Sequence, residues 1–284
     1  MSPELSQKLA LAVDSMPAFP KSVQKILELT RDLNCTPKAL VLVIEKDPVI
    51  TVKILKVLNS AYYSLPKQIS SINHAVVYLG FNTIKNLALG IAAIGILPKR
   101  NDAGFDIQQY LLHSLATAAI AKLLAGRVVG ADAGDCYIAG LLHDFGKVVF
   151  ARFMPEKFGA ALAVCQRDGI SLPLALRDSI GVDHAFVGAM LVEKWRFSTS
   201  LVEAIRYQCA ADLKDDAMIA CVFAANQIAK KLNFGFAGNP CVEAFPPSVE
   251  ARFGGSLDAL LTALGDLTPL FEEARMFSRI ETAA

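Results

Sequence analysis

The chain lacks the features that would place it in a membrane, in an oxidising compartment or on nucleic acid. Its six cysteines form no CxxC pair and match no zinc or disulfide spacing. The formal net charge is only +1, so we expect no general attraction to nucleic acid or acidic membranes. The longest apolar run, residues 87–97, is too short to cross a bilayer, and the first residues show no secretory signal. We therefore expect a cytoplasmic protein with no membrane insertion and no nucleic-acid partner.

Apolar sequence with helix-start signals is abundant instead. The residues AVILMFWYC make up 54% of the chain, which is enough for a large core. Proline directly follows Thr36 and Asp47, a pattern typical of the first turn of a helix. Asp106, Asp183 and Asp216 each stand before a further apolar run with helical spacing. With no strand pattern and no internal repeat, the sequence predicts an all-α protein.

Two polar segments divide these helices. The stretch at residues 98–106 is the best candidate boundary between an N-terminal helical half and a second half. A loop rich in glycine and proline at 233–247 precedes a tail that carries one or two amphipathic helices. For this tail two roles stay open: packing on the bundle, or forming a homodimer.

Three of the four histidines fall on apolar helical segments of the second half. They are His113, His143 and His184, and Asp144 directly follows His143. Neutral imidazole and carboxylate groups suit iron, manganese, nickel or zinc. We expect the HisAsp pair to lie inside one helix, where both side chains reach a single ion placed over the helix face between them.

The surroundings of the HisAsp pair allow two interpretations. Gly140 and Gly146 cost helix stability, which indicates a close approach by another helix or by a ligand. A histidine in a core helix, however, is most often a hydrogen-bonded core residue. Asp144 and Lys147 stand at i,i+3, where they can form a simple ion pair.

Five segments taken together resemble a known family, the HDOD domain (HD-related output domain) of bacterial signalling proteins. This family lies within the HD superfamily of metal-dependent phosphohydrolases. The segments are 16–29, 43–90, 137–147 (YIAGLLHDFGK), 181–195 and 201–209. The resemblance implies a multi-helix bundle of the HD type with an N-terminal helical subdomain. It covers residues 12–232, as an N-terminal half at 12–98 and an HD-like half at 105–232, and leaves 233–284 as a loop and helical tail.

The resemblance also implies a ligand set. The superfamily's metal site falls on His113, His143, Asp144 and Asn226, and His184 matches a further histidine of binuclear relatives. Asn226 departs from the superfamily pattern, because it replaces a carboxylate with a weaker neutral oxygen ligand.

A second departure concerns the binuclear relatives alone. Gln208 and Cys209 replace the His-His pair of these relatives, and their GYP segment is absent from this chain. A two-metal site is therefore not expected, because its mechanism needs both ions held about 3.5–4 Å apart.

These departures favour a non-catalytic regulatory or output domain that acts by protein contact. The alternative is a phosphohydrolase with one ion, in which Lys147 neutralises phosphate charge and His184 acts as an acid. In a third interpretation the protein is a purely structural interaction module, and its pocket binds no ligand. The expected cofactor is either none or one divalent Fe, Mn, Ni or Zn. The partners that the resemblance implies are two-component or cyclic-dinucleotide signalling proteins.

Overall fold

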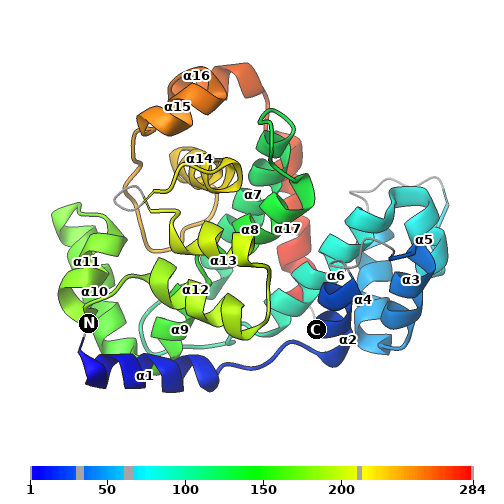
Figure 1. Ribbon diagram of the computed structural model, residues 1–284, viewed down its shortest axis with the longest axis horizontal. Helices are drawn as coiled ribbons and strands as arrows, with labels where there is room; N and C mark the ends of the chain where they lie inside the picture. Colours follow the sequence, from blue (N-terminus) through cyan, green and yellow to red (C-terminus); the bar gives the residue numbers. More distant parts are fainter. Residues whose placement is uncertain (1, 30–34, 61–66, 210–212, 283–284) are drawn as a thin grey trace. The chain divides into compact units, whose positions relative to one another are not determined.

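The computed structural model describes residues 2–29, 35–60, 67–209 and 213–282, and these residues form helices and loops without a strand. The all-α prediction is confirmed. The chain divides into two compact units (Figure 1), one formed by Met1–Met16 with Leu97–Phe271 and the other by Pro17–Ile96 with Glu272–Ala284. Across the described ranges, no helix combines the length and the apolar character that a bilayer crossing needs.

The helix starts follow the local chemistry of the sequence. Thr36 accepts a hydrogen bond from the Ala39 N–H, and Asp47 accepts from two N–H groups of its own first turn. Asp106, Asp183 and Asp216 cap their helices in the same way. Each cap satisfies backbone donors that would otherwise have no partner at a helix start. These predicted caps are therefore confirmed.

The smaller unit is a helical bundle with its own apolar core. Its helices are α2 (Lys21–Leu29), α3 (Pro37–Glu45), α4 (Pro48–Leu58), α5 (Ile72–Leu79) and α6 (Phe81–Gly95). Helix α3 packs on α2, α4 and α5, and α6 packs on α4 and α5. Ile44, Ile54 and Ile84 are completely buried between them. The last helix of the chain, α17 (Thr268–Thr282), crosses the division between the units.

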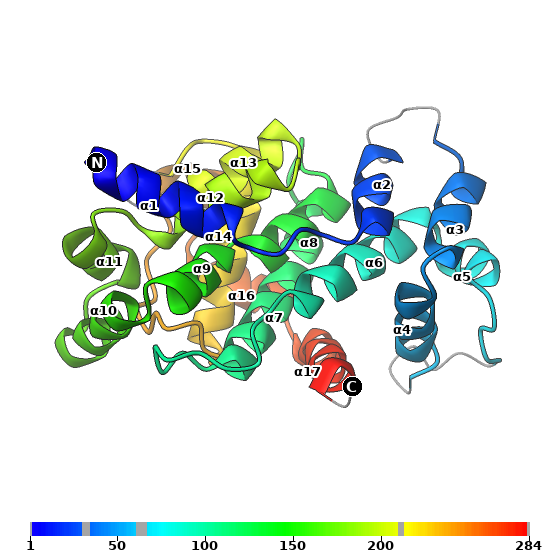
Figure 2. The same ribbon diagram turned by 90° about the horizontal axis from the view of Figure 1, so that it is seen from below.

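The larger unit contains the histidine-bearing segments. Its helices are α1 (Pro3–Asp14), α7 (Ile107–Ala125), α8 (Ala133–Leu142), α9 (Phe145–Phe153), α10 (Pro155–Asp168), α11 (Leu172–Ile180), α12 (His184–Lys194), α13 (Thr199–Arg206), α14 (Ala217–Lys231), α15 (Pro247–Phe253) and α16 (Leu257–Leu264). Helices α7, α8 and α14 pack on one another and form its centre. Helix α13 packs on α8 and α14, α12 packs on α13 and α9, and α1 lies along α9 and α12 (Figure 2).

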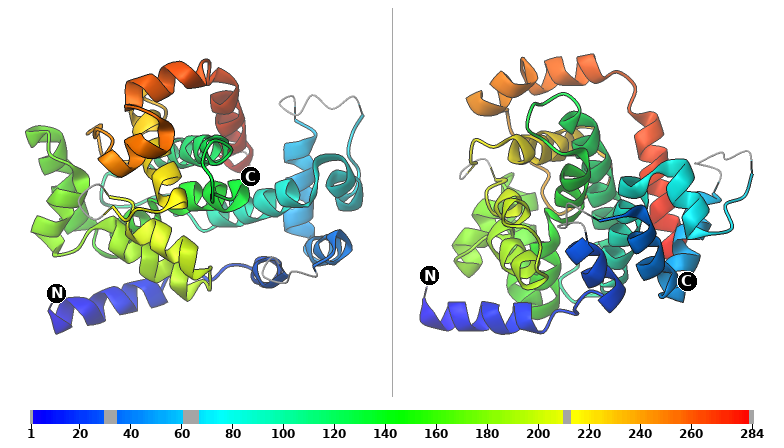
Figure 3. Two further views of the ribbon diagram at one scale, coloured as in Figure 1. Left: turned by 45° about the horizontal axis from the view of Figure 1, so that its top comes forward. Right: turned by 45° about the vertical axis from the view of Figure 1, so that its right-hand side comes forward.

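Part of the tail packs on this unit. Helices α15 and α16 lie against α14 (Figure 3). Phe271, at the start of α17, stacks on Phe234 with ring centroids 4.1 Å apart. Of the two roles left open for the tail, packing on the bundle is therefore observed for the segment up to residue 271.

Two glycines let helices approach closely around the HisAsp pair. A Cβ on Gly140 would lie 2.8 Å from the Ala118 Cα of α7. A Cβ on Gly146 would run into the His184 carbonyl oxygen of α12 and lie 2.7 Å from the Gly188 nitrogen. The predicted close approach of another helix is confirmed at both positions, and it brings His184 toward the start of α9.

We expect Gly146→Ala to lower the free energy of unfolding by about 2–3 kcal/mol or more, because the added methyl group forces α9 away from α12. Urea unfolding followed by circular dichroism measures this change. Gly126→Ala is the matched control, since a Cβ there comes no nearer than 3.5 Å to its closest neighbour. Equal stability of the two variants would contradict the close packing of α9 on α12.

Candidate functional site

The HisAsp pair lies between two helices and not inside one. Helix α8 ends at Leu142 and α9 begins at Phe145, while Asp144 has φ −100° and ψ 7°. The prediction of one continuous helix was wrong here. The bend has a physical consequence, because it frees the two side chains from the 100° spacing of a helix and lets both of them face the centre of the unit.

The backbone fixes the orientation of the His143 ring. Its Nδ1 lies 2.6 Å from the Gly140 carbonyl oxygen and donates a hydrogen bond to it. The other ring nitrogen, Nε2, is completely buried and lies 3.2 Å from the Asp144 Oδ2. Both nitrogens of this ring therefore face oxygen atoms, and Nε2 points to the carboxylate at the centre of the site.

His113 and Asn226 meet across α7 and α14. The His113 Nε2 lies 3.2 Å from the Asn226 Oδ1, and its N–H donates a hydrogen bond to this oxygen. Burial lowers the pKa of His113 to about 3, so the ring is neutral at pH 7. An amide carries both an NH2 donor and a carbonyl acceptor. Rotation of the Asn226 amide by 180° would therefore turn its NH2 group toward His113, and the His113 Nε2 would then accept the hydrogen bond with its lone pair.

Asp144 forms a buried ion pair with Lys147. The Lys147 Nζ donates to the Asp144 Oδ2 at 2.6 Å and to the Ala237 carbonyl oxygen at 2.8 Å. The exposed fractions of these two residues are only 1% and 2%. Burial alone would raise the pKa of Asp144, but His143 and the Lys147 ammonium hold it well below its usual range. The i,i+3 ion pair suggested by the sequence is present, and it is buried.

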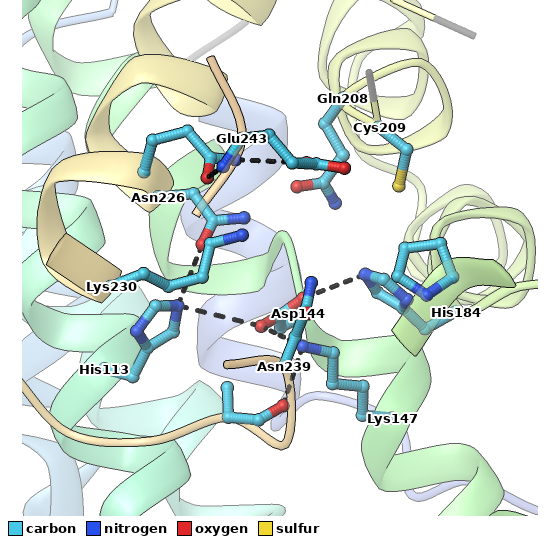
Figure 4. Close-up of a pocket in the computed structure, with 13 residues that line it drawn as sticks. His113, Asp144, Lys147, His184, Gln208, Cys209, Asn226, Lys230, Asn239 and Glu243 are labelled. Carbon is cyan, nitrogen blue, oxygen red and sulfur yellow. Dashed lines mark hydrogen bonds and ion pairs between the residues drawn. The ribbon is translucent and has the colours of Figure 1, made fainter. Parts of the chain in front are cut away.

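His184 faces the same carboxylate from the opposite side. Its Nε2 lies 3.0 Å from the Asp144 Oδ1. Burial, together with the nearby Lys147 ammonium, lowers the pKa of His184. In Figure 4, Asp144 and Lys147 lie between His113 and Asn226 on one side and His184 on the other. His113, His143 and Asp144 thus converge, whereas His184 contacts this group at Asp144 and Asn226 contacts it at His113.

The donor set fits one divalent ion. His113, His143 and Asp144 each offer a ligand atom, and these atoms lie within 4.8 Å of one another. Two imidazoles and one carboxylate suit a first-row transition metal. The Lys147 ammonium already contacts the carboxylate, however, and would compete with such an ion.

Gln208 and Cys209, the residues that replace the His-His pair of the binuclear relatives, line the same cavity. The Gln208 amide donates to the His143 carbonyl oxygen. Burial raises the pKa of the Cys209 thiol, which keeps it protonated and a poor ligand. Lys230 also lines the cavity. Burial lowers the pKa of Lys230 to about 8, although Glu243 opposes this effect.

The loop at residues 233–246 completes the cavity, and the sequence did not reveal its role. It supplies Ala237, Asn239 and Glu243 to the lining. The Phe236 N–H donates to the Gln109 carbonyl oxygen of α7, which anchors the loop next to His113. Gly235 has φ +69°, and a Cβ there would lie 2.5 Å from the same oxygen. The glycine content indicated a turn, but no local pattern showed which side chains the turn carries.

Comparisons with known proteins match most of the chain. A family model described as the HDOD domain matches residues 16–211. An uncharacterized protein of Treponema pallidum (strain Nichols) is 28% identical over 208 residues, which cover 72% of this chain and 39% of that protein. The chain therefore spans well under half the length of this curated relative.

Solved structures share the fold. An HDOD domain protein of unknown function from Geobacter sulfurreducens has a TM-score of 0.79 at 24% identity, with 97% of this chain and 98% of that chain covered. A candidate phosphohydrolase from Shewanella amazonensis SB2B reaches 0.73 at 24% identity, covering 95% and 98%. A candidate signal transduction protein from Marinobacter aquaeolei VT8 reaches 0.81 at 22% identity, covering 98% and 66%. At these identities the likeness shows the fold alone.

We expect the protein to lose stability as the pH falls below 6.5. Unfolded His113 takes up a proton near pH 6.5, whereas the folded ring resists protonation until about pH 3. The unfolded state therefore binds more protons in this window, which costs about 2 kcal/mol at pH 5 from His113 alone. Urea unfolding at pH 7.5 and pH 5 measures the difference.

His113→Gln is expected to reduce this difference between the two pH values. His74→Gln is the matched control, because His74 lies exposed on α5. An unchanged pH dependence in His113→Gln would contradict a neutral, buried His113.

Proposed function

The chain belongs to the HDOD domain family, and from this premise we propose that it is a non-catalytic regulatory domain of bacterial signal transduction. It acts in the cytoplasm by contact with two-component or cyclic-dinucleotide signalling proteins. The HD-type cavity is retained as the responsive part of the domain, and it does not run a turnover cycle. One observation carries this proposal, the buried ion pair between Asp144 and Lys147.

This ion pair removes the charge that a catalytic metal would need. Asp144 is the carboxylate of the HisAsp pair, and its Oδ2 accepts from the Lys147 ammonium at 2.6 Å. The late carboxylate of the superfamily is replaced here by the Asn226 amide. The charged residues that line the cavity are Asp144, Glu243, Lys147 and Lys230, and their charges cancel. A cavity whose charges cancel attracts a divalent cation only weakly.

A mononuclear phosphohydrolase is the second candidate, favoured by the convergence of three ligand atoms. His113, His143 and Asp144 would hold the ion, which would supply a Lewis acid for a phosphoryl oxygen. Lys147 would move from Asp144 to the phosphate, and His184 would donate a proton to the leaving oxygen. This candidate requires the buried ion pair to open in every turnover.

Elemental analysis of the purified protein combined with a phosphodiesterase assay separates the two candidates. The non-catalytic proposal predicts hydrolysis of bis(p-nitrophenyl) phosphate in Mn2+ no faster than that of His143→Ala. Stoichiometric Fe, Mn, Ni or Zn together with cleavage that His143→Ala abolishes would establish the hydrolase instead.

We expect Lys147→Met to raise the affinity for Mn2+ by about tenfold or more, because the variant removes the cation that competes for Asp144. Equilibrium dialysis of the metal-free protein measures the dissociation constant. Lys122→Met is the matched control, since it removes an exposed lysine from the helix that carries His113. Equal Mn2+ affinity in the wild type and Lys147→Met would show that the ammonium does not compete with a metal.

Partner contact needs a direct test. Purified sensor kinases and receiver proteins, immobilised one at a time, are the appropriate targets.

We further propose that residues 12–232 form the HDOD domain, with halves at 12–98 and 105–232. The tail at 233–284 then serves it by completing the cavity, and a homodimer through this tail is tested by light scattering.

A further inference from the structure

Two cysteines from distant parts of the sequence meet at the turn that follows α10. Cys165 lies near the end of this helix, and Cys241 lies in the loop at residues 233–246. The Cys165 thiol donates to the Ile170 carbonyl oxygen at 2.9 Å, and the Cys241 thiol donates to the Gly169 carbonyl oxygen at 3.3 Å. Because these two carbonyl groups belong to neighbouring residues, both thiols lie against the same turn.

A second contact connects Cys165 with the loop itself. Its Sγ lies 3.7 Å from the carbonyl oxygen of Gly238, a residue of the same loop as Cys241. Burial, together with the nearby Cys241 thiol, raises the pKa of Cys165 to about 11. The Cys165 thiol therefore stays protonated at pH 7 until a reactive partner reaches it.

The two thiols differ in their access to solvent. Cys165 is completely buried, whereas Cys241 is partly exposed. An oxidant in solution therefore meets Cys241 first, and Cys165 lies beside it as the thiol that completes a disulfide. Cys136 and Cys221 also lie next to each other, but both are completely buried, so the folded protein shields this pair from an oxidant.

We propose that Cys241 and Cys165 form a site of reversible oxidation that a hydroperoxide converts into a disulfide. The Cys241 sulfur attacks one oxygen of hydrogen peroxide, so that an S–O bond forms and the O–O bond breaks. The second oxygen leaves as water with the thiol proton. The Cys165 sulfur then attacks the Cys241 sulfur, the S–S bond forms, and the hydroxyl group leaves as a second water with the Cys165 proton. Two thiols are oxidised and one peroxide is reduced.

The disulfide would act on the loop that completes the HD-type cavity. The Cys241 carbonyl oxygen accepts from the Lys230 ammonium at 2.7 Å, and the Ala237 carbonyl oxygen of the same loop accepts from Lys147. A bond from Cys241 to Cys165 would attach this wall of the cavity covalently to α10. The inference does not depend on the proposed function, since neither thiol lines the cavity. It adds a redox input to that function.

Mass spectrometry of the full chain tests the proposal. The reduced, folded protein is treated with hydrogen peroxide, and the remaining thiols are blocked with N-ethylmaleimide in denaturant before digestion with trypsin. We expect the tryptic peptides 158–167 and 232–252 to be linked by a disulfide in most molecules, and dithiothreitol to release them. Cys136 and Cys221 are expected to carry N-ethylmaleimide.

Substitutions separate the roles of the two thiols. Cys241→Ser is expected to abolish the linkage. In Cys165→Ser we expect Cys241 to accumulate as a sulfenic acid that dimedone traps, because the second thiol is missing. Cys35→Ser is the matched control, since Cys35 is also partly exposed but belongs to the smaller unit, and we expect it to form the linkage as the wild type does. Circular dichroism confirms that each variant is folded.

Hydrogen exchange tests the effect on the cavity wall. We expect amides of residues 233–246 to exchange about tenfold or more slowly in the oxidised protein. The proposal is wrong if the folded wild type yields no linked peptides, if Cys35→Ser abolishes the linkage, or if exchange in the loop is the same in both redox states. Because these assays read thiols and loop amides, their outcome is separate from that of the phosphodiesterase assay.

Discussion

The buried ion pair between Asp144 and Lys147 is the interaction on which the larger unit depends. A carboxylate and an ammonium are costly inside a protein unless each is compensated by partners. Asp144 has Lys147 on one oxygen and His184 on the other, and Lys147 also donates to the Ala237 carbonyl oxygen. The pair thereby connects the α8–α9 junction, helix α12 and the loop at 233–246, three segments far apart in the sequence.

The bend at residues 143–144 makes this arrangement possible. Helix α8 stops at Leu142, so His143 donates from Nδ1 to the Gly140 carbonyl oxygen and points Nε2 inward. Gly146 lets the backbone of α12 come close enough for His184 to reach Asp144. The Lys147 ammonium lies on the Asp144 carboxylate, and this contact supports the proposed regulatory role.

The sequence predicted much of this structure. Caps at Asp106, Asp183 and Asp216 follow local chemistry, and local chemistry is readable from a short stretch of chain. The helix break at residues 143–144 was not predictable in this way. The residues before and after the break are apolar, so the spacing of apolar residues is the same on both sides and does not mark where the helix ends. The contributions of Ala237 and Glu243 depend on where a loop crosses the bundle. Tertiary contacts determine the path of this loop, and it cannot be predicted from the composition of the sequence or from the spacing of its residues.

The most direct test of this account is a double-mutant cycle on the ion pair, read as the free energy of unfolding in urea at pH 7.5. Asp144→Asn leaves a buried ammonium without its partner, and we expect it to cost about 3–5 kcal/mol. The double variant Asp144→Asn with Lys147→Met buries no charge at these positions. We expect it to be more stable than Asp144→Asn alone, with a coupling of about 2 kcal/mol or more. Additive effects of the two substitutions would contradict the central place of this pair.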